Sequence, residues 1–271
     1  MMIKAIAIDM DGTFLDLEQK FDYTYYMKIK DRLDKHNIQL VFASGNQMKQ
    51  IRNHFNHPIN VVAENGTYIG VQDEVIHIDT MSKQQIHAIL DILECYCGFA
   101  IVICGTKNAY ITQKDQEMMS ILSQGFSTIL YADNLREIKE EVLKITLLLK
   151  PNFDNSLFNS LMSDLAAIAQ PTTSGFGYID IMKRGINKAS GLAILNQLWH
   201  LSFDDWAAFG DSNNDLQMLR SVCYSFAMKN ANEEVKAIAK QTLAYSNAEN
   251  GVLRTIEKLL DEIDRELDEF D

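Results

Sequence analysis

The segment Ile3–Thr13, which reads IKAIAIDMDGT, decides the fold. Its short apolar run predicts a buried strand, and Gly12 after the run indicates a turn. Asp9 and Asp11 therefore follow the carboxyl end of a strand, where open α/β sheets bind ligands. Because residues two apart in an extended segment share a face, both carboxylates can point into one site. Their mutual repulsion calls for either a bound cation or a carboxylate pair with separate acid and base roles.

Strand and helix patterns alternate at both ends of the chain. This alternation predicts an α/β fold with a Rossmann-like, doubly wound parallel sheet. The sequence predicts further strands over 39–43, 60–63, 206–209, 224–227 and 242–244 and helices over 23–36, 47–55, 188–199, 216–220 and 232–240.

The middle of the chain has a different pattern, with longer strands of β-branched and aliphatic residues. The sequence there predicts strands over 99–104, 109–112, 143–149 and 177–182 and helices over 83–96, 115–123 and 155–167. This pattern indicates an α+β domain inserted into the α/β core. We expect the core to comprise residues 1–81 and 185–271 and the inserted domain to comprise residues 82–184.

Composition excludes several classes of function. The chain has 271 residues, and 25 Lys+Arg against 37 Asp+Glu give a net charge of -12. This balance disfavours nucleic acid as a partner, because such binding depends on neutralising phosphates. No stretch approaches the roughly 18 apolar residues of a membrane helix, and Asp9 interrupts the amino-terminal run too early for a signal peptide. The four cysteines and six histidines show no metal-ligand spacing. We therefore expect a cytoplasmic protein with structural or surface histidines.

Polar side chains, and the backbone of one glycine, follow several of the predicted strands or begin a predicted helix. In addition to Asp9 and Asp11, they are Ser44, Gly45, Lys188, Asp211, Asn214 and Asp215. In a doubly wound sheet these segments converge on one crevice. Hard carboxylate oxygens suit Mg²⁺, whereas an ammonium group, a hydroxyl group and helix-start amides suit a phosphoryl group. A carboxylate that faces phosphorus can act as a nucleophile.

Several of these residues also have a structural interpretation. Ser44 is a preferred N-cap residue, and a lone Lys188 would be a surface lysine. Asp215 suits a helix amino terminus by its charge alone. The occurrence of all the segments in one chain favours the chemical interpretation.

Four ordered motifs resemble those of the haloacid dehalogenase superfamily. They are Asp9-x-Asp11-Gly12-Thr13, Ser44-Gly45, Lys188 and Gly210-Asp211-x-x-Asn214-Asp215, and they cover nearly the whole chain. The inserted domain lies between the second and third motifs, where Cof-type phosphatases of this superfamily carry their C2 cap. The resemblance therefore implies a catalytic core with an α+β cap that closes over the site.

The resemblance also implies a role for each motif residue. Asp9 would be the nucleophile, and Asp11 would be the general acid and base. Asp9, Asp211 and the backbone carbonyl group of Asp11 would hold Mg²⁺. The implied phosphate-binding residues are Ser44, Gly45, Lys188 and Asn214, and the implied supporting residues are Asp215, Asn46 and Asn65.

Three further segments are similar to bacterial Cof-type sugar phosphatases, namely 43–47, 63–66 and 173–177. Asn46 stands where many other Cof-type members have an arginine. The similarity implies a cap loop over the sugar part of a substrate, whereas the structural alternative is a surface turn with no substrate role. The expected residues of this loop are Thr173, Ser174, Gly175 and Tyr178.

The expected activity is magnesium-dependent hydrolysis of a small phosphomonoester, with sugar phosphates favoured, through an aspartyl-phosphate on Asp9. The partner would be a small phosphorylated metabolite, and no protein partner is evident. One alternative is a sugar phosphotransferase or phosphomutase that shares the intermediate. Another is a non-catalytic sensor of phosphate esters, although a pure binder has no need of the acid Asp11.

Overall fold

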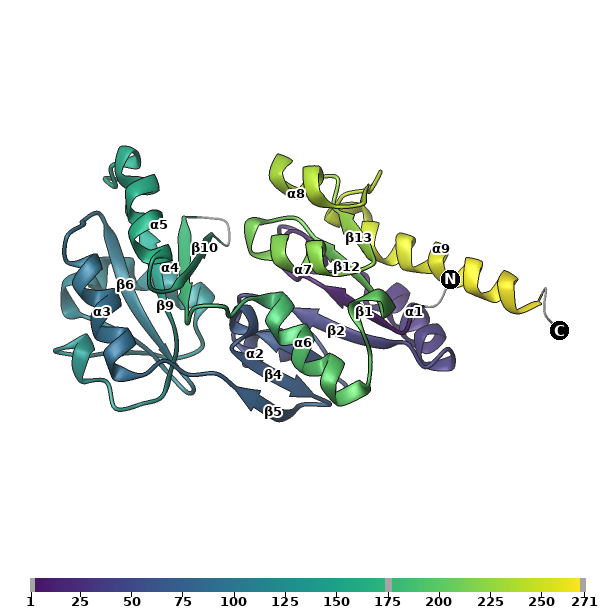
Figure 1. Ribbon diagram of the computed structural model, residues 1–271, viewed down its shortest axis with the longest axis horizontal. Helices are drawn as coiled ribbons and strands as arrows, with labels where there is room; N and C mark the ends of the chain where they lie inside the picture. Colours follow the sequence, from purple (N-terminus) through teal and green to yellow (C-terminus); the bar gives the residue numbers. More distant parts are fainter. Residues whose placement is uncertain (1–2, 174–176, 269–271) are drawn as a thin grey trace.

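The computed structural model describes residues 3–173 and 177–268 and shows two β-sheets in separate lobes (Figure 1). The strands of the eight-stranded core sheet are β1 (Ala5–Ile8), β2 (Gln39–Ala43), β3 (Asn60–Ala63), β4 (Tyr68–Val71), β5 (Glu74–Ile78), β12 (Trp206–Gly210), β13 (Tyr224–Ala227) and β14 (Gln241–Thr242). The strands of the six-stranded cap sheet are β6 (Phe99–Gly105), β7 (Ala109–Ile111), β8 (Ile129–Tyr131), β9 (Val142–Leu149), β10 (Gln170–Thr173) and β11 (Tyr178–Met182).

The core sheet has the order β14-β13-β12-β1-β2-β3-β4-β5. β1 is fully buried and pairs in parallel with β2 on one side and with β12 on the other. Its apolar residues read as a continuous run because a central parallel strand is covered on both faces. The predicted Rossmann-like parallel sheet is thereby confirmed.

The helices are α1 (Tyr23–Lys35), α2 (Met48–Arg52), α3 (Lys83–Leu93), α4 (Met119–Gly125), α5 (Phe158–Ala166), α6 (Lys188–Trp199), α7 (Leu216–Ser221), α8 (Glu233–Ile238) and α9 (Gly251–Asp268). In the core lobe, α1 packs against α9, and α6 packs against α7. The buried residues of α9 recur every three or four positions and form the apolar stripe by which this helix packs: Val252, Leu253, Ile256, Leu259 and Leu260. None of the helices in the described ranges is both long and apolar enough to span a lipid bilayer.

The core sheet ends in a hairpin, β4–β5, that the sequence did not predict. The two strands pair antiparallel and are joined by Gln72 and Asp73, whose φ angles are 51° and 66°. Two-residue hairpin turns of this kind usually carry Asn-Gly or Asp-Gly, so the turn lacks its usual sequence signal. β5 is mostly exposed and shows no apolar face to identify it as a strand.

The cap sheet has the order β10-β11-β9-β6-β7-β8 and is antiparallel except between β7 and β8. Alternate residues of β9 point to opposite faces of the sheet. Ile145 and Leu147 belong to a hydrophobic core shared with α3 and α5. Lys144 and Thr146 consequently point to the other face, where they line a cavity that opens onto the core lobe.

Several predicted boundaries in the inserted segment differ from the structure. The predicted helix over 115–123 begins as a 3-10 helix, Gln113–Met118, and continues as α4. Thr173, which we expected in a loop, ends β10 and pairs with Ile179 of β11. Ser174 and Gly175 lie outside the described residues. The domain limits at 81/82 and 184/185 stay a prediction.

Candidate active site

The predicted motif residues meet at the carboxyl edge of the core sheet. Asp9 follows β1, Ser44 follows β2, and Asp211 follows β12. These three strands are neighbours in the order β12-β1-β2 and run parallel, so their carboxyl ends lie side by side. The structure therefore brings together the segments that the sequence placed at one crevice.

Lys188 begins α6 and is fully buried among carboxylates. Its Nζ lies 2.5 Å from Asp9 Oδ1 and 2.6 Å from Asp215 Oδ1. Burial alone lowers the pKa of an ammonium group, but Asp215 and Asp9 outweigh burial and raise the pKa of Lys188 above its usual value. Lys188 therefore stays charged and holds Asp9 in a fixed position.

Asp9, Asp211 and Asp215 form a cluster in which one carboxylate oxygen of each lies within 4.8 Å of the others. Burial, followed by the charge of Asp215, raises the pKa of Asp9 well above its usual value and that of Asp211 to about 6. Thr13 Oγ1 donates a hydrogen bond of 2.8 Å to Asp211 Oδ1. Three crowded carboxylates beside a single ammonium group make an oxygen donor set that fits a hard divalent cation.

Asp215 also closes the loop that carries it. Its Oδ2 accepts hydrogen bonds from the backbone N–H groups of Asp211 at 3.0 Å and Ser212 at 3.1 Å. Asp215 can therefore both stabilise the start of the helix and take part in the site, because Oδ2 accepts from the backbone while Oδ1 contacts Lys188.

The side chain of Asp11 lies outside the carboxylate cluster and contacts the loop that follows β2. Asn46 Nδ2 donates a 2.6 Å hydrogen bond to Asp11 Oδ2, and the backbone N–H of Asn46 donates to Ser44 Oγ at 3.0 Å. Asn46 thus fixes the orientation of Asp11 relative to the Ser44-Gly45 turn. The predicted metal contact of the Asp11 backbone carbonyl group stays a prediction.

The turn Glu64-Asn65-Gly66 after β3 has three successive residues with positive φ, at 50°, 56° and 104°. Two of them are not glycine, and such residues store backbone strain unless their surroundings hold them. Asn65 is held on both sides. Its Nδ2 donates to Asp180 Oδ2 at 2.7 Å, and its Oδ1 accepts from Asn214 Nδ2 at 3.0 Å.

Replacing Gly66 with alanine is expected to lower the free energy of unfolding by more than about 1 kcal/mol. A Cβ at Gly66 would lie 2.2 Å from the backbone oxygen of Asn187, the N-cap of α6, in addition to the strain of positive φ. Urea denaturation measures the effect. Gly185→Ala is the matched control, because Gly185 has φ +84° but nothing within 4 Å of its Cβ position. Equal losses in the two variants would contradict the predicted clash.

Three residues of the cap sheet that the sequence analysis did not single out also line the site: Lys144, Thr146 and Asp180. Lys144 of β9 places its Nζ 2.9 Å from Glu64 Oε2, 3.3 Å from Asp180 Oδ2 and 2.6 Å from the backbone oxygen of Gly45. Thr146 Oγ1 donates to Asp180 Oδ1 at 2.6 Å. Because Glu64 and Gly45 belong to the core lobe, these buried contacts join the two lobes close to the carboxylate cluster.

A cavity of about 690 Å³ lies between the lobes and contains Asp9 and Asp11 in its wall. Tyr178, predicted from the cap loop, lines this cavity, whereas Thr173 accepts a hydrogen bond from Asn213 Nδ2 at 3.1 Å. His54 also lines it, although we expected only structural or surface histidines. The remaining lining residues include the polar set Gln19, Asn46, Gln47, Gln50 and Asn53 and the apolar set Leu17, Ile121 and Phe126.

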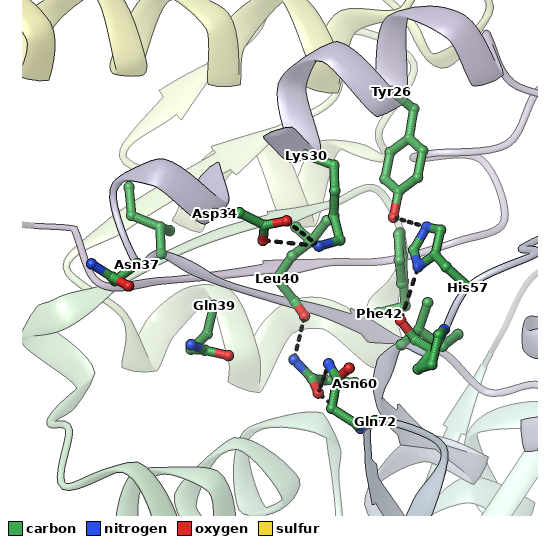
Figure 2. A pocket seen from close by; sticks show the side chains of 13 residues that line it. Tyr26, Lys30, Asp34, Asn37, Gln39, Leu40, Phe42, His57, Asn60 and Gln72 are labelled. Atoms are coloured by element: carbon green, nitrogen blue, oxygen red, sulfur yellow. Dashed lines mark hydrogen bonds and ion pairs between the residues drawn. The ribbon is translucent and has the colours of Figure 1, made fainter. Parts of the chain in front are cut away.

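A second cavity, of about 180 Å³, lies at the opposite edge of the core sheet, by the first residues of β2 and β3 (Figure 2). Its polar side chains bind one another: Lys30 pairs with Asp34, Tyr26 contacts His57, and Asn60 bonds to Gln72 and to a backbone oxygen. This cavity contains none of the motif residues, so the site lies in the larger cavity.

Comparison with known proteins agrees with this geometry. Residues 6–256 match the family model of haloacid dehalogenase-like hydrolases. The chain belongs to this hydrolase family. The hydrolase is 33% identical over 264 residues to YbjI of Escherichia coli K12, a 5-amino-6-(5-phospho-D-ribitylamino)uracil phosphatase, covering 96% of this chain and 97% of that one. It is 27% identical to the HMP-PP phosphatase of Klebsiella pneumoniae 342, covering 87% and 88% of the two chains.

Among solved structures, SMU.1108c of Streptococcus mutans UA159 is similar to this hydrolase, with a TM-score of 0.89, 32% sequence identity and coverage of 96% of this chain and 99% of that one. The resemblance to Cof-type phosphatases is thus confirmed, and the hydrolase is a phosphoric monoester hydrolase. Hydrolases of this family generally use a divalent metal ion, which the cluster of Asp9, Asp211 and Asp215 fits.

Proposed function

We propose that this hydrolase is a magnesium-dependent phosphatase of small phosphomonoesters, with sugar or polyol phosphates as the favoured class. The observation that carries the proposal is the contact of buried Lys188 with Asp9, beside Asp211 and at the wall of the cavity. A carboxylate held by an ammonium group in this way is poised as a nucleophile toward phosphorus.

In the first step, a carboxylate oxygen of Asp9 forms a bond to phosphorus while the ester P–O bond breaks. The leaving oxygen takes a proton from the protonated carboxyl group of Asp11, whose orientation Asn46 fixes through a 2.6 Å hydrogen bond. The product alcohol and an aspartyl-phosphate on Asp9 result. Lys188 remains beside Asp9 and offsets negative charge throughout.

In the second step, water attacks phosphorus and gives its proton to the Asp11 carboxylate. The bond between Asp9 and phosphorus breaks, which frees the Asp9 carboxylate and inorganic phosphate. Ser44, the Gly45 amide and Asn214 are the proposed phosphate-binding groups. Both steps depend mainly on position and charge compensation, which a preorganised site supplies.

The carboxylate chemistry favours Mg²⁺ as the divalent ion, because hard oxygen ligands and retained waters suit it. When bound, Mg²⁺ would neutralise charge on the phosphoryl oxygens. Asp9 and Asp211 are the proposed ligands, with Asp215 supporting them through the cluster. Lys188 and Asn65 would keep the site in place when the metal exchanges, since their contacts do not involve it.

Two observations support a sugar or polyol as the leaving group. The core wall of the cavity carries side-chain amides at Asn46, Gln47, Gln50 and Asn53, which donate and accept hydrogen bonds as hydroxyl groups do. The relative YbjI is named for a phosphate ester on a ribityl chain. A polyol phosphate reaching from Asp9 along this wall would place its hydroxyl groups against these amides.

Phosphate release from a panel of sugar, polyol, nucleotide and cofactor phosphates tests the proposal. We expect release from sugar or polyol phosphates with Mg²⁺ and a loss of at least about 100-fold in rate when EDTA removes the metal. Restoring Mg²⁺ should restore the rate. Binding of these esters without release would favour a sensor, and an isomerised sugar phosphate without free phosphate would favour a mutase.

A further inference from the structure

We propose that the site selects phosphomonoesters whose leaving group carries no negative charge, and that Lys144 determines this selection because Glu64 and Asp180 already hold its charge. This inference rests on the proposed phosphatase function and narrows its substrate class. It concerns the part of the cavity where Lys144 of the cap sheet contacts the Gly45 turn of the core.

Lys144 is the cation that the cap sheet contributes to the cavity wall. Three oxygen atoms surround its Nζ within 3.3 Å: the Gly45 carbonyl oxygen, Glu64 Oε2 and Asp180 Oδ2. An ammonium group has three N–H donors, so these oxygens occupy its coordination. Lys144 therefore offers no unshared donor to a substrate anion.

Lys144 also forms an ion pair with the buried carboxylate of Glu64. Glu64 Oε2 is buried, and Lys144 Nζ, 2.9 Å away, compensates its charge. Glu64 lies in the turn with positive φ, and its carboxylate contacts Lys144 of the cap sheet. Since an unpaired buried carboxylate is strongly unfavourable, drawing Lys144 toward a ligand would leave Glu64 uncompensated.

The local charge balance then opposes a second anion. Lys144, Glu64 and Asp180 together carry one positive and two negative charges, and their relative positions are fixed by buried contacts. The described cavity wall also contains Asp9 and Asp11, of which Asp11 is protonated when the ester binds in the proposed mechanism. A carboxylate or a second phosphate on the leaving group would meet the net negative charge of Lys144, Glu64 and Asp180, which disfavours its binding.

Besides Lys144, the basic side chain in the described wall of this cavity is His54. Burial lowers the pKa of His54, although the charge of Asp11 opposes this effect. Lys188 is enclosed between Asp9 and Asp215 and is fully buried. The side chains that remain to contact the leaving group of the substrate are neutral amides and apolar groups. They suit hydroxyl groups and an uncharged ring rather than an anion.

Sorbitol 6-phosphate and 6-phosphogluconate make a matched pair of substrates, because they differ in a terminal hydroxymethyl or carboxylate group. We expect kcat/KM for 6-phosphogluconate to be at least about tenfold lower. In the Glu64→Gln variant, the charge of Lys144 should become available to the substrate. The ratio of kcat/KM for 6-phosphogluconate to kcat/KM for sorbitol 6-phosphate should then rise by at least about fivefold. Glu262→Gln, at an exposed position of α9, should leave the ratio unchanged.

Equal kcat/KM values for the two esters would overturn the inference, as would an unchanged ratio in a folded Glu64→Gln variant. If that variant fails to fold, Asp180→Asn removes the other carboxylate and should shift the ratio in the same direction. Absence of release from both esters would contradict the proposed phosphatase function. In that case, calorimetry with Mg²⁺ would measure the dissociation constants of the two esters and test the charge selection separately. Equal dissociation constants would overturn the inference.

Discussion

Replacing Asp9 with asparagine is expected to lower kcat for phosphate release by about four orders of magnitude or more. The amide preserves the shape of the side chain but removes the anionic oxygen that would form the bond to phosphorus. Water would have to attack the ester directly, without the covalent intermediate. Steady-state phosphate release with a favoured ester measures the loss.

The control for this variant is Asp133→Asn, which makes the same chemical change at an exposed position of the cap lobe. Its rate should equal that of the unaltered enzyme. Incubation of the unaltered enzyme with a labelled ester, followed by acid quenching, should trap phosphate on the protein, and Asp9→Asn should trap none. Turnover by Asp9→Asn within tenfold of the unaltered rate would rule out Asp9 as the nucleophile.

Replacing Lys188 with methionine is expected to lower the free energy of unfolding by about 3–5 kcal/mol and to abolish phosphate release. Methionine has a similar length but leaves Asp9 and Asp215 as adjacent buried carboxylates without their ammonium partner. Urea denaturation measures the stability, and Lys258→Met at an exposed position of α9 is the control.

The stability loss in Lys188→Met should depend on pH. Burial and Asp215 already raise the pKa of Asp9, and removal of Lys188 takes away the main effect that opposes them. A carboxyl group whose pKa is raised on folding binds its proton more tightly in the folded state, so its destabilising effect grows as pH rises. The deficit should therefore shrink as pH falls from neutrality toward the ordinary carboxyl pKa of about 4. A deficit independent of pH would contradict this explanation.

The sequence predicts the parallel part of the core sheet well, because each central strand is a short apolar run that ends in polar residues. Asp9, Ser44 and Asp211 could be assigned to one edge for this reason, and their convergence is a consequence of strand order. Lys188 was found as the first residue of a helix. The residue roles in catalysis stay predictions that the variants above test.

The contacts between the lobes could not be predicted from the sequence. Lys144 lies in a strand whose other residues are apolar except Thr146, and its partner Glu64 is distant along the chain. Their contact depends on the pairing of β9 with β11, which sets Thr146 opposite Asp180, and on a turn with positive φ at Glu64. Sequence alternation shows which residues share a face but not which lobe that face meets.

The position of β1 between β2 and β12 has a consequence for protein synthesis. Ala5 lies beside Gln39 on one side and beside Trp206 on the other. A chain still emerging from the ribosome can pair β1 with β2 early, but the apolar edge that β12 covers stays open until late in translation. Such pairing between distant segments slows folding and leaves partly folded chains prone to association. Asp9 would therefore meet Lys188 and Asp211 only when most of the chain has been made.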